Sequence, residues 1–228
     1  MGRERSEADG ARREAQPLVL LGGGGHASDV LGLIEFINSL EPAWQVLGFA
    51  DDSEDPRLDR FEGRGVPFLG TIDQALSRCG EAKFIATIGF PEGRRLVAQR
   101  AERAGLRPAT LVDPRIVHGT GARIAEGCVV LDGVHLSPLC QLGRHVYVST
   151  GAIVGHDTVV GDFTSLMPAC AVSGDVVIGE GVLIGLTSSI AQGIRIGAGA
   201  RVGAGAVVLR DVEAGVTVTG VPARPRAG

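Results

Sequence analysis

The sequence predicts two structural units in a chain of 228 residues. We expect an α/β domain, half of a Rossmann fold, over residues 17–113 and a parallel β-helix over residues 114–228. Aliphatic residues recur every six positions in the second half, and strand-like and helix-like segments alternate in the first half. Glycine is also abundant, with 35 residues, whereas Phe, Trp and Tyr number only 7, 1 and 1. Many tight turns and few large side chains are typical of stacked short strands.

The second half follows a period of six residues. An Ile, Val or Leu stands at every sixth position from Ile124 to Val208, and the position four after each is small or β-branched. We expect the aliphatic residue to point inward and the other to fill the corner, so that three hexads close one triangular coil. Fifteen hexads, from Ile124 to Glu213, then give five coils, stacked about 4.8 Å apart.

The first half alternates between strands and helices. The expected strands cover 17–21, 45–50, 66–69 and 83–88, and the expected helices cover 26–40, 71–79 and 93–105. Such alternation favours a parallel sheet with helices packed on its faces. Residues 1–16 are charged and lack an apolar stretch, so we expect them to form a disordered tail.

Composition and charge exclude several classes of function. A net charge of −4 provides no basic field for nucleic acid. The chain has no apolar run of 18 residues and no secretory signal, so we expect a cytoplasmic protein without a membrane span. The four cysteines form no CxxC pair, and Cys128, Cys140 and Cys170 take inward positions of the hexads, where we expect small buried side chains.

A glycine-rich turn between the first strand and the first helix is the candidate nucleotide site. Residues 22–25, followed by His26 and Ala27, fit G-x-G-x-x-A, in which glycines let backbone N–H groups approach a phosphate. Asp51 and Asp52 follow the second strand. Fewer than 100 residues are available, which suits one nucleotide better than a dinucleotide. Packing alone also explains such a turn, and His26 either contacts the ligand or simply begins the helix.

His156 and Asp157 are the candidate catalytic pair. A neutral imidazole is the usual general base near pH 7, and an adjacent carboxylate can hold its tautomer and stabilise the imidazolium. His156 stands two residues after an inward aliphatic residue, where a side chain can point outward from a corner. Gly174 follows eighteen residues later, one coil away. A glycine N–H beside the base can stabilise a developing oxyanion.

The other histidines of the second half fit local roles better. We expect His135 and His145 to be surface or core residues with local hydrogen bonds. His118, His135, His145 and His156 share no position on the coil of eighteen residues and form no His-x4-His pair. The sequence therefore predicts no zinc site and no other metal.

Together these motifs resemble a known family. GGGGHA, GFADD, IG, the hexads with GHDTVVGDFTSLMPACAVSGDVVIGEGVLIG and the closing GVPAR are similar to bacterial sugar acetyltransferases of the hexapeptide-repeat, left-handed β-helix family. These include UDP-4-amino-sugar (bacillosamine-type) N-acetyltransferases, GDP-perosamine N-acetyltransferases and sialic acid O-acetyltransferases. The resemblance covers residues 17–224. It implies a left-handed β-helix and a homotrimer, with acetyl-CoA between adjacent β-helices and a nucleotide-linked sugar on the N-terminal domain.

The resemblance also implies roles for individual residues. His156 matches the general base, Asp157 its acidic partner, and Gly174 the backbone donor to the oxyanion. Gly174 also matches a residue that borders acetyl-CoA. The other matches are Leu186, Ala204 and Ser149 for acetyl-CoA, and Gly24, His26, Asp51 and Asp52 for the nucleotide-linked sugar.

The chain departs from the family's pattern at three places. Ser165 stands where the family commonly has a second histidine, and it is a candidate substrate contact. Ser149 stands where the family often has Asn. Phe90 and Pro91 replace an Asn-containing sequence after Ile88 and Gly89. The first departure concerns how the acceptor is oriented, and the last concerns which nucleotide or sugar is recognised.

We therefore predict acetyl transfer from acetyl-CoA to the amino group of a nucleotide-linked amino sugar, with His156 as general base. One alternative is O-acetylation of a sugar hydroxyl, such as that of sialic acid, because the same base serves both acceptors. A second alternative is a non-catalytic trimer that binds a nucleotide-linked sugar.

Overall fold

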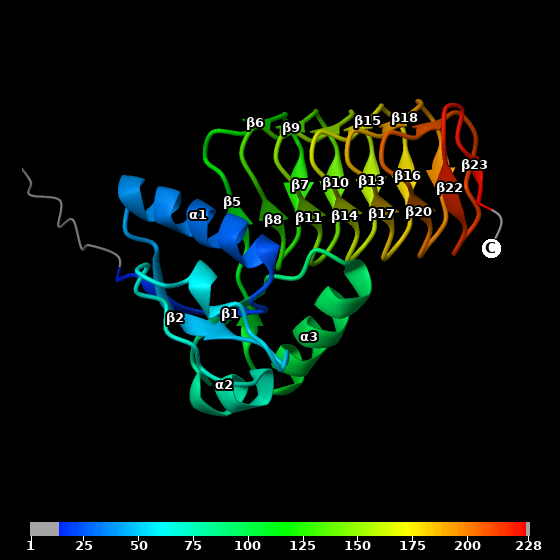
Figure 1. The fold of residues 1–228 in the computed structure, drawn as a ribbon. Helices are drawn as coiled ribbons and strands as arrows, with labels where there is room; N and C mark the ends of the chain where they lie inside the picture. The colour runs from blue at the N-terminus through cyan, green and yellow to red at the C-terminus, as the bar shows by residue number, and fades with distance from the viewer. Residues whose placement is uncertain (1–13, 227–228) are drawn as a thin grey trace, which may run out of the picture.

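The structure is a computed structural model that describes residues 14–226. It contains an N-terminal α/β domain and a left-handed parallel β-helix, which confirms the predicted fold class (Figure 1). The expected tail, residues 1–16, lies outside the described part except for its last three residues, and Gln16 already belongs to the first strand. Within residues 14–226, no helix is both long enough and apolar enough to cross a membrane.

Four parallel strands form the sheet of the N-terminal domain, in the order β2-β1-β3-β4. These strands are β1 (Gln16–Leu21), β2 (Trp44–Ala50), β3 (Lys83–Ala86) and β4 (Arg107–Pro108). The helices are α1 (Gly25–Leu40), the 3₁₀ turn η1 (Leu58–Arg60), α2 (Ile72–Arg78) and α3 (Pro91–Arg103). The strand expected over residues 66–69 is reduced to one bridge between Phe49 and Phe68. Pro67 lies inside that segment and has no N–H to donate to a sheet.

Alternate residues of β1 face two different cores, as the pleat of a strand requires. Leu18 and Leu20 pack with α1, whereas Val19 and Leu21 pack with α2 and α3. The core around α1 also contains Tyr147 of the β-helix. Helix α1 therefore lies between the sheet and the β-helix (Figure 1).

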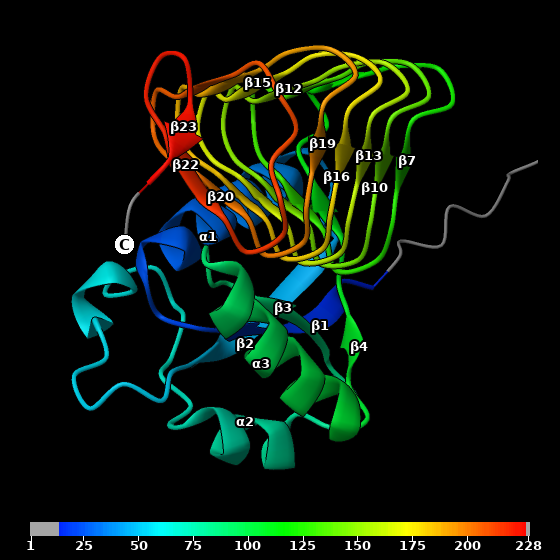
Figure 2. The ribbon, with the colours of Figure 1, turned by 90° about the vertical axis from the view of Figure 1, so that its right-hand side faces the viewer.

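Three sheets of short parallel strands make up the β-helix (Figure 2). The first contains β5, β8, β11, β14, β17, β20 and β22, with the antiparallel β23 at its edge; the second contains β7, β10, β13, β16 and β19; the third contains β6, β9, β12, β15, β18 and β21. From β5 to β21, paired strands are eighteen residues apart, as Tyr147, Ser165 and Leu183 illustrate. This spacing confirms that three hexads make one coil.

The strands have the following bounds. They are β5 (Leu111–Val112), β6 (Val117–His118), β7 (Arg123–Ile124), β8 (Val129–Val130), β9 (His135–Leu136), β10 (Gln141–Leu142), β11 (Tyr147–Val148), β12 (Ile153–Val154), β13 (Val159–Val160), β14 (Ser165–Leu166), β15 (Ala171–Val172), β16 (Val177–Ile178), β17 (Leu183–Ile184), β18 (Ser189–Ile190), β19 (Arg195–Ile196), β20 (Arg201–Val202), β21 (Val207–Val208), β22 (Thr217–Thr219) and β23 (Arg224–Pro225).

The β-helix differs from the predicted hexads at both ends. Leu111 of β5 already pairs with Val129 of β8, so the first coil begins two residues before the expected domain boundary at residue 113. The aliphatic pattern does not show this coil because the position six residues before Ile124, where Ile, Val or Leu is expected, is the exposed His118. At the other end, Arg201 of β20 pairs with Thr217 of β22, sixteen residues later. The last coil is therefore two residues shorter than the period predicts.

The expected inward residues form the core of the β-helix. Leu136 and Val148 are fully buried, and so are the three cysteines of the hexads. Burial raises the pKa of Cys128 and Cys170 to about 12 and that of Cys140 to about 11. Because a thiol must ionise to act as a nucleophile, these cysteines serve as small apolar side chains.

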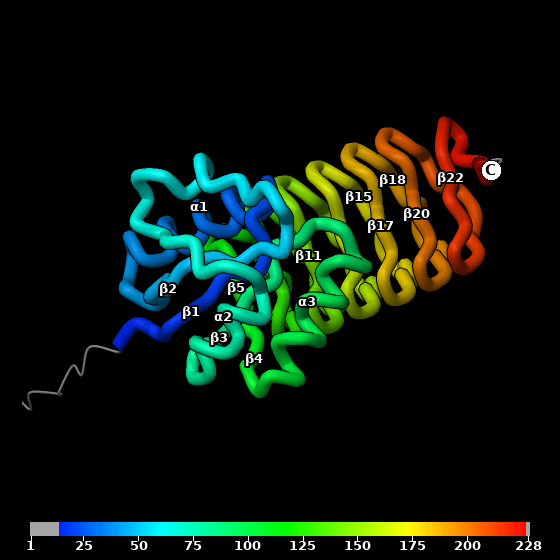
Figure 3. Tube along the Cα trace, turned by 60° about the horizontal axis from the view of Figure 1, so that its bottom comes forward, coloured from blue at the N-terminus to red at the C-terminus, as the bar shows by residue number. Residues whose placement is uncertain are grey.

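Arg94 of α3 fastens the two domains to each other. Its side chain is 2% exposed and donates hydrogen bonds of 2.7–3.1 Å to the carbonyls of Ile88, Gly89, His145, Phe163 and Thr164 and to Ser165 Oγ. Burial lowers the pKa of Arg94 to about 10, so the guanidinium stays charged at neutral pH. Helix α3 lies along the β-helix from Glu102, which pairs with Arg144, to Glu92, which pairs with Arg201 of β20. The end of the β-helix with β22 and β23 extends past the N-terminal domain (Figure 3).

Candidate active site

His156 and Asp157 form the turn between β12 and β13. His156 Nδ1 lies 2.8 Å from Asp157 Oδ2, and the two side chains are 55% and 47% exposed. Asp157 has a φ of 58°, a left-handed conformation that Asp tolerates better than most residues. With Nδ1–H donating to the carboxylate, Nε2 is left as the acceptor that a general base requires. The pair is thus held at the surface in a form suited to proton abstraction.

Gly174 lies directly against the imidazole of His156. A Cβ atom at this position would be 2.3 Å from His156 Nε2 and 2.5 Å from Cε1, so only glycine fits without moving the ring. Within the described residues, the N–H of Gly174 donates no hydrogen bond, whereas its carbonyl accepts from Gly193 N–H at 3.1 Å. The residue against which the imidazole packs thus has an N–H free to donate, as stabilisation of an oxyanion requires.

Leu186 and Ala204 stack on another corner of the β-helix. The Gly205 N–H donates to the Leu186 carbonyl at 2.9 Å, which joins the two turns, and both side chains are exposed. The corner continues toward the N-terminal domain through Ser149, which is 4% exposed and whose N–H donates to the Leu166 carbonyl at 2.8 Å. This corner offers a row of backbone groups and small or apolar side chains to an extended ligand.

The glycine-rich turn leads into α1 as the sequence predicts. Gly24 is the N-cap residue, is exposed and has no heavy atom within 4 Å of where its Cβ would lie. His26 is half-buried, and its ring meets that of Tyr147 edge-on with the centroids 4.9 Å apart. A Cβ on Gly89 would lie 2.1 Å from His26 Cε1, so the ring rests on that glycine. Burial lowers the pKa of His26, which favours the neutral imidazole.

Asp51 and Asp52 hold the backbone around this turn. Asp51 Oδ2 accepts from Gly23 N–H at 2.5 Å, and its Oδ1 accepts from Ser53 N–H at 2.7 Å. Asp52 accepts from Ile72 N–H at the start of α2 and pairs with Arg100. Partial burial opposes ionisation of Asp52, but Arg100 and the Ile72 N–H outweigh it and hold its pKa below the usual range. Asp51 thus shapes the turn, and Asp52 joins it to α2 and α3.

Ser165 is a buried part of the domain junction. Its Oγ donates to the Gly89 carbonyl at 2.6 Å and accepts from Arg94 Nη2 at 3.0 Å. Because Gly89 also supports His26, Ser165 is linked to the start of α1 through one residue. Its contact with a substrate stays a prediction.

The predicted residues gather in three groups, and one of them is the corner with Leu186, Ala204 and Ser149. His156, Asp157 and Gly174 lie on the corner between the sheets of β12 and β13, which points away from the N-terminal domain (Figure 2). Gly24, His26, Asp51 and Asp52 lie in the N-terminal domain, where His26 packs against Tyr147 and the Gly89 carbonyl accepts from Ser165 Oγ. One chain alone does not bring His156 to the glycine-rich turn.

Sequence reasoning missed two residues that lie beside the glycine-rich turn. Tyr147 packs on His26, and Arg60 Nη1 lies 3.6 Å from where a Cβ of Gly25 would be. The single tyrosine of the chain, placed just before an inward aliphatic residue, is a signal that could have indicated Tyr147. Arg60 gave no such signal, because Arg57 and Arg64 stand close to it in the same segment.

The chain matches the family model of the PglD N-terminal domain over residues 17–101. A perosamine N-acetyltransferase variant from Caulobacter crescentus, solved with CoA and GDP-perosamine, is 30% identical with a TM-score of 0.81, covering 93% of this chain and 97% of that one. The acetyltransferase domain of PglB from Neisseria gonorrhoeae, solved with acetyl coenzyme A, is 29% identical with a TM-score of 0.82, covering 93% and 100%. WeeI from Acinetobacter baumannii shares the fold at 24% identity, with a TM-score of 0.83 and coverage of 93% and 100%. No curated protein sequence matches the chain.

Proposed function

Because the chain belongs to the acetyl-CoA-dependent sugar N-acetyltransferases of the hexapeptide-repeat, left-handed β-helix family, we propose that it acetylates the amino group of a nucleotide-linked sugar, with His156 as general base. One observation carries the proposal. His156 Nδ1 lies 2.8 Å from Asp157, and its ring lies against Gly174, whose N–H is free within the described residues. A base, a carboxylate and an oxyanion donor thus meet at one point of the surface.

In the proposed reaction the acceptor amine attacks the thioester carbon of acetyl-CoA, and a C–N bond forms. His156 Nε2 takes the proton that the nitrogen loses, and Asp157 stabilises the imidazolium. Gly174 N–H donates to the developing oxyanion. The C–S bond then breaks, and the imidazolium returns its proton to the leaving thiolate. General base catalysis of this kind typically contributes about 10²–10⁴-fold to the rate.

The corner of Leu186 and Ala204 suits the pantetheine arm of acetyl-CoA. The arm is long and thin and carries amides, and this corner presents stacked backbone groups beside an exposed leucine and an alanine. Related structures contain CoA or acetyl-CoA. Since acetyl-CoA is a cytoplasmic metabolite, we place the reaction in the cytoplasm.

We also propose that the active site is shared between neighbouring chains of a homotrimer. The corner between β12 and β13, which carries His156, points away from the N-terminal domain, which carries His26 in α1 (Figure 2). A nucleotide-linked acceptor bound near His26 therefore needs the base of a second copy. Rotational symmetry repeats the same contact at each interface and so yields three equivalent sites. Ser149 and Ser165 lie on the N-terminal-domain side of this shared site.

Hybrid trimers test the shared site. His156→Ala and His26→Ala each inactivate one half, so each variant alone is expected to lose most of its activity. An intact site takes His156 from a subunit with His26→Ala and His26 from a neighbouring subunit with His156→Ala. When the two variants assemble at random in equal amounts, each mixed trimer contains one such site, and about a quarter of wild-type activity should return. Activity no greater than the sum of the two variants would contradict a shared site.

A panel of acceptors tests the reaction itself. Release of CoA from acetyl-CoA is measured with UDP-, GDP- and dTDP-linked 4-amino sugars, and with CMP-sialic acid and free sialic acid. We expect release with one nucleotide-linked amino sugar and a product that resists hydroxylamine, because amides resist it and esters do not. Release with the sialic acids alone, giving a hydroxylamine-sensitive product, would replace the proposal by O-acetylation.

A further inference from the structure

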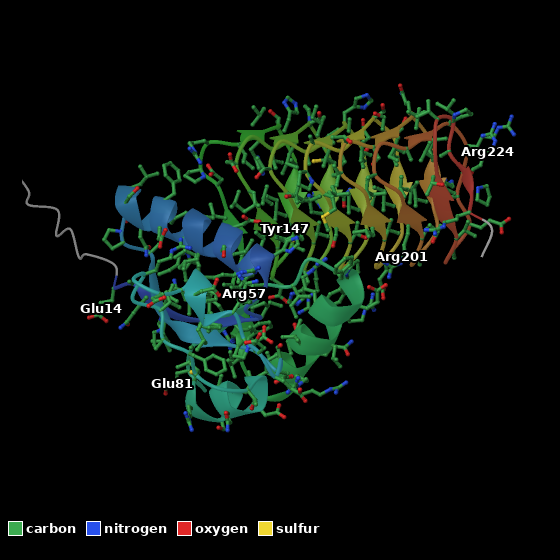
Figure 4. The ribbon with its side chains drawn as sticks, in the orientation of Figure 1. Glu14, Arg57, Glu81, Tyr147, Arg201 and Arg224 are labelled. Carbon is green, nitrogen blue, oxygen red and sulfur yellow. The ribbon has the colours of Figure 1, made fainter. Side chains whose placement is uncertain are left out.

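Two buried side-chain atoms without a hydrogen-bond partner flank the start of α1. Within residues 14–226 these atoms are Arg60 Nη1 and Tyr147 Oη. Tyr147 is 1% exposed and packs edge-on against His26 where α1 meets β11 (Figure 4), and Arg60 Nη1 lies beside Gly25. Buried polar groups are almost always hydrogen-bonded, to protein, to water or to a ligand, and an unpaired one is costly. Two of them around one helix end indicate a place where a polar ligand binds.

Arg60 differs from the two other arginines of its segment. Arg57 pairs with Asp59 at 2.9 Å, and Arg64 pairs with Glu35 of α1 at 2.6 Å. Arg60 has no carboxylate within ion-pair distance among the described residues, although one of its nitrogens is buried. The guanidinium is thus directed inward, toward α1, without an anion of the protein to explain it.

Aromatic packing explains why Arg60 reaches the glycine-rich turn. The next residue, Phe61, is 3% exposed and stacks on Phe49 with the ring centroids 3.8 Å apart. Phe49 in turn borders the turn, because a Cβ on Gly23 would lie 3.1 Å from its Cε2. This stack fixes the end of η1, and with it Arg60, beside residues 23–25.

The start of α1 is itself suited to an anion. Its N-cap residue, Gly24, provides no side-chain cap, and the first turn contains no acidic residue. The first N–H groups of a helix and its dipole attract negative charge. Asp51, whose carboxylate contacts the turn at Gly23, accepts two backbone N–H groups and so is already engaged.

We propose that Arg60 binds the diphosphate of the nucleotide-linked sugar at the N-terminus of α1. A planar guanidinium can donate two parallel hydrogen bonds to phosphate oxygens, and the helix end supplies further N–H donors. The ligand class is a nucleoside diphosphate, free or linked to a sugar. This inference rests on the proposed nucleotide-linked acceptor and adds the residue that recognises its charge.

Calorimetric titration of the full chain with nucleoside diphosphates tests the inference. UDP, GDP, dTDP and CDP are compared with their monophosphates for wild type, Arg60→Gln, Arg60→Lys and Arg57→Gln. We expect wild type to prefer a diphosphate, and Arg60→Gln to bind it about 10–100-fold more weakly, as loss of charged hydrogen bonds predicts. Arg60→Lys should retain part of the affinity. Arg57→Gln removes an exposed guanidinium from the same segment and should bind like wild type.

The possible results separate this inference from the proposed function. If wild type binds a diphosphate and Arg60→Gln binds it within twofold, with an unchanged melting temperature, Arg60 is not the contact and the nucleotide-linked acceptor still stands. If Arg57→Gln weakens binding as much as Arg60→Gln, general charge explains the effect and the specific assignment is wrong. If wild type binds none of the four diphosphates, both the inference and the nucleotide-linked acceptor are wrong.

Discussion

Gly174→Ala should inactivate the enzyme without unfolding it. The new Cβ would lie 2.3 Å from His156 Nε2, whereas carbon and nitrogen atoms in contact need about 3.5 Å, so the ring must move by about 1.2 Å. The backbone of Gly174 does not require a positive φ, and the ring it would meet belongs to a half-exposed side chain. The clash is therefore relieved by moving the imidazole and not by opening the coil.

The magnitude follows from that displacement. A shift of about 1 Å in a catalytic group can cost about 10²-fold in rate, and the same shift disturbs the 2.8 Å contact with Asp157. We expect kcat to fall about 100-fold, with the KM for acetyl-CoA within a few-fold of wild type. The double variant Gly174→Ala with His156→Ala should be no slower than His156→Ala alone, because both changes act through one group.

The assay is steady-state CoA release with a thermal melt of each variant. Gly80→Ala is the matched control, because its Cβ would have no heavy atom within 4 Å and its backbone φ is not positive. A Gly174→Ala enzyme with a wild-type melting temperature and a kcat within twofold of wild type would refute the reasoning. It would show that the position of the His156 ring does not limit the reaction.

Four further predictions address other parts of the molecule. Arg94→Met removes the donor to the buried His145 and Phe163 carbonyls and to Ser165 Oγ. The free energy of unfolding, measured by urea denaturation, should fall by about 3–5 kcal/mol. Burial lowers the pKa of His26 and His145 below 6.5, so the unfolded chain binds more protons than the folded one in this range. The free energy of unfolding should therefore fall as the pH drops from 6.5 toward the folded-state pKa values. Urea unfolding of His145→Asn should show a weaker dependence of that free energy on pH. Ala204→Tyr should raise the KM for acetyl-CoA about tenfold or more by filling the exposed corner, with a smaller change in kcat. Dialysis against a chelator should leave kcat unchanged, because residues 14–226 contain no cluster of His, Cys, Asp or Glu that could hold a metal.

The sequence predicts the β-helix well because its period is a direct consequence of packing. Every inward aliphatic position from Leu136 to Val208 is at most 2% exposed. The six-residue pattern does not extend to the first coil, because its His118 is exposed where an inward aliphatic residue is expected. It also ends before the last coil, which is two residues shorter than the other coils. A periodic core therefore indicates the middle of a solenoid better than its ends.

The candidate site was predictable only where its residues are close in sequence or one coil apart. His156, Asp157 and Gly174 meet these conditions, and the structure places them in contact. Tyr147 reaches His26 through packing between domains, which no spacing in the sequence encodes. Arg60 depends in the same way on the stacking of Phe61 against Phe49.

The most direct test of the whole account is acetyl transfer by wild type and His156→Ala, measured side by side with the same nucleotide-linked amino sugar. Acetyl-CoA binding is measured on both proteins as the control for folding. We predict an N-acetylated product from wild type and a kcat about 10²–10⁴-fold lower for His156→Ala, with acetyl-CoA affinity nearly unchanged. Equal turnover by the two proteins would remove His156 from the mechanism and contradict the account.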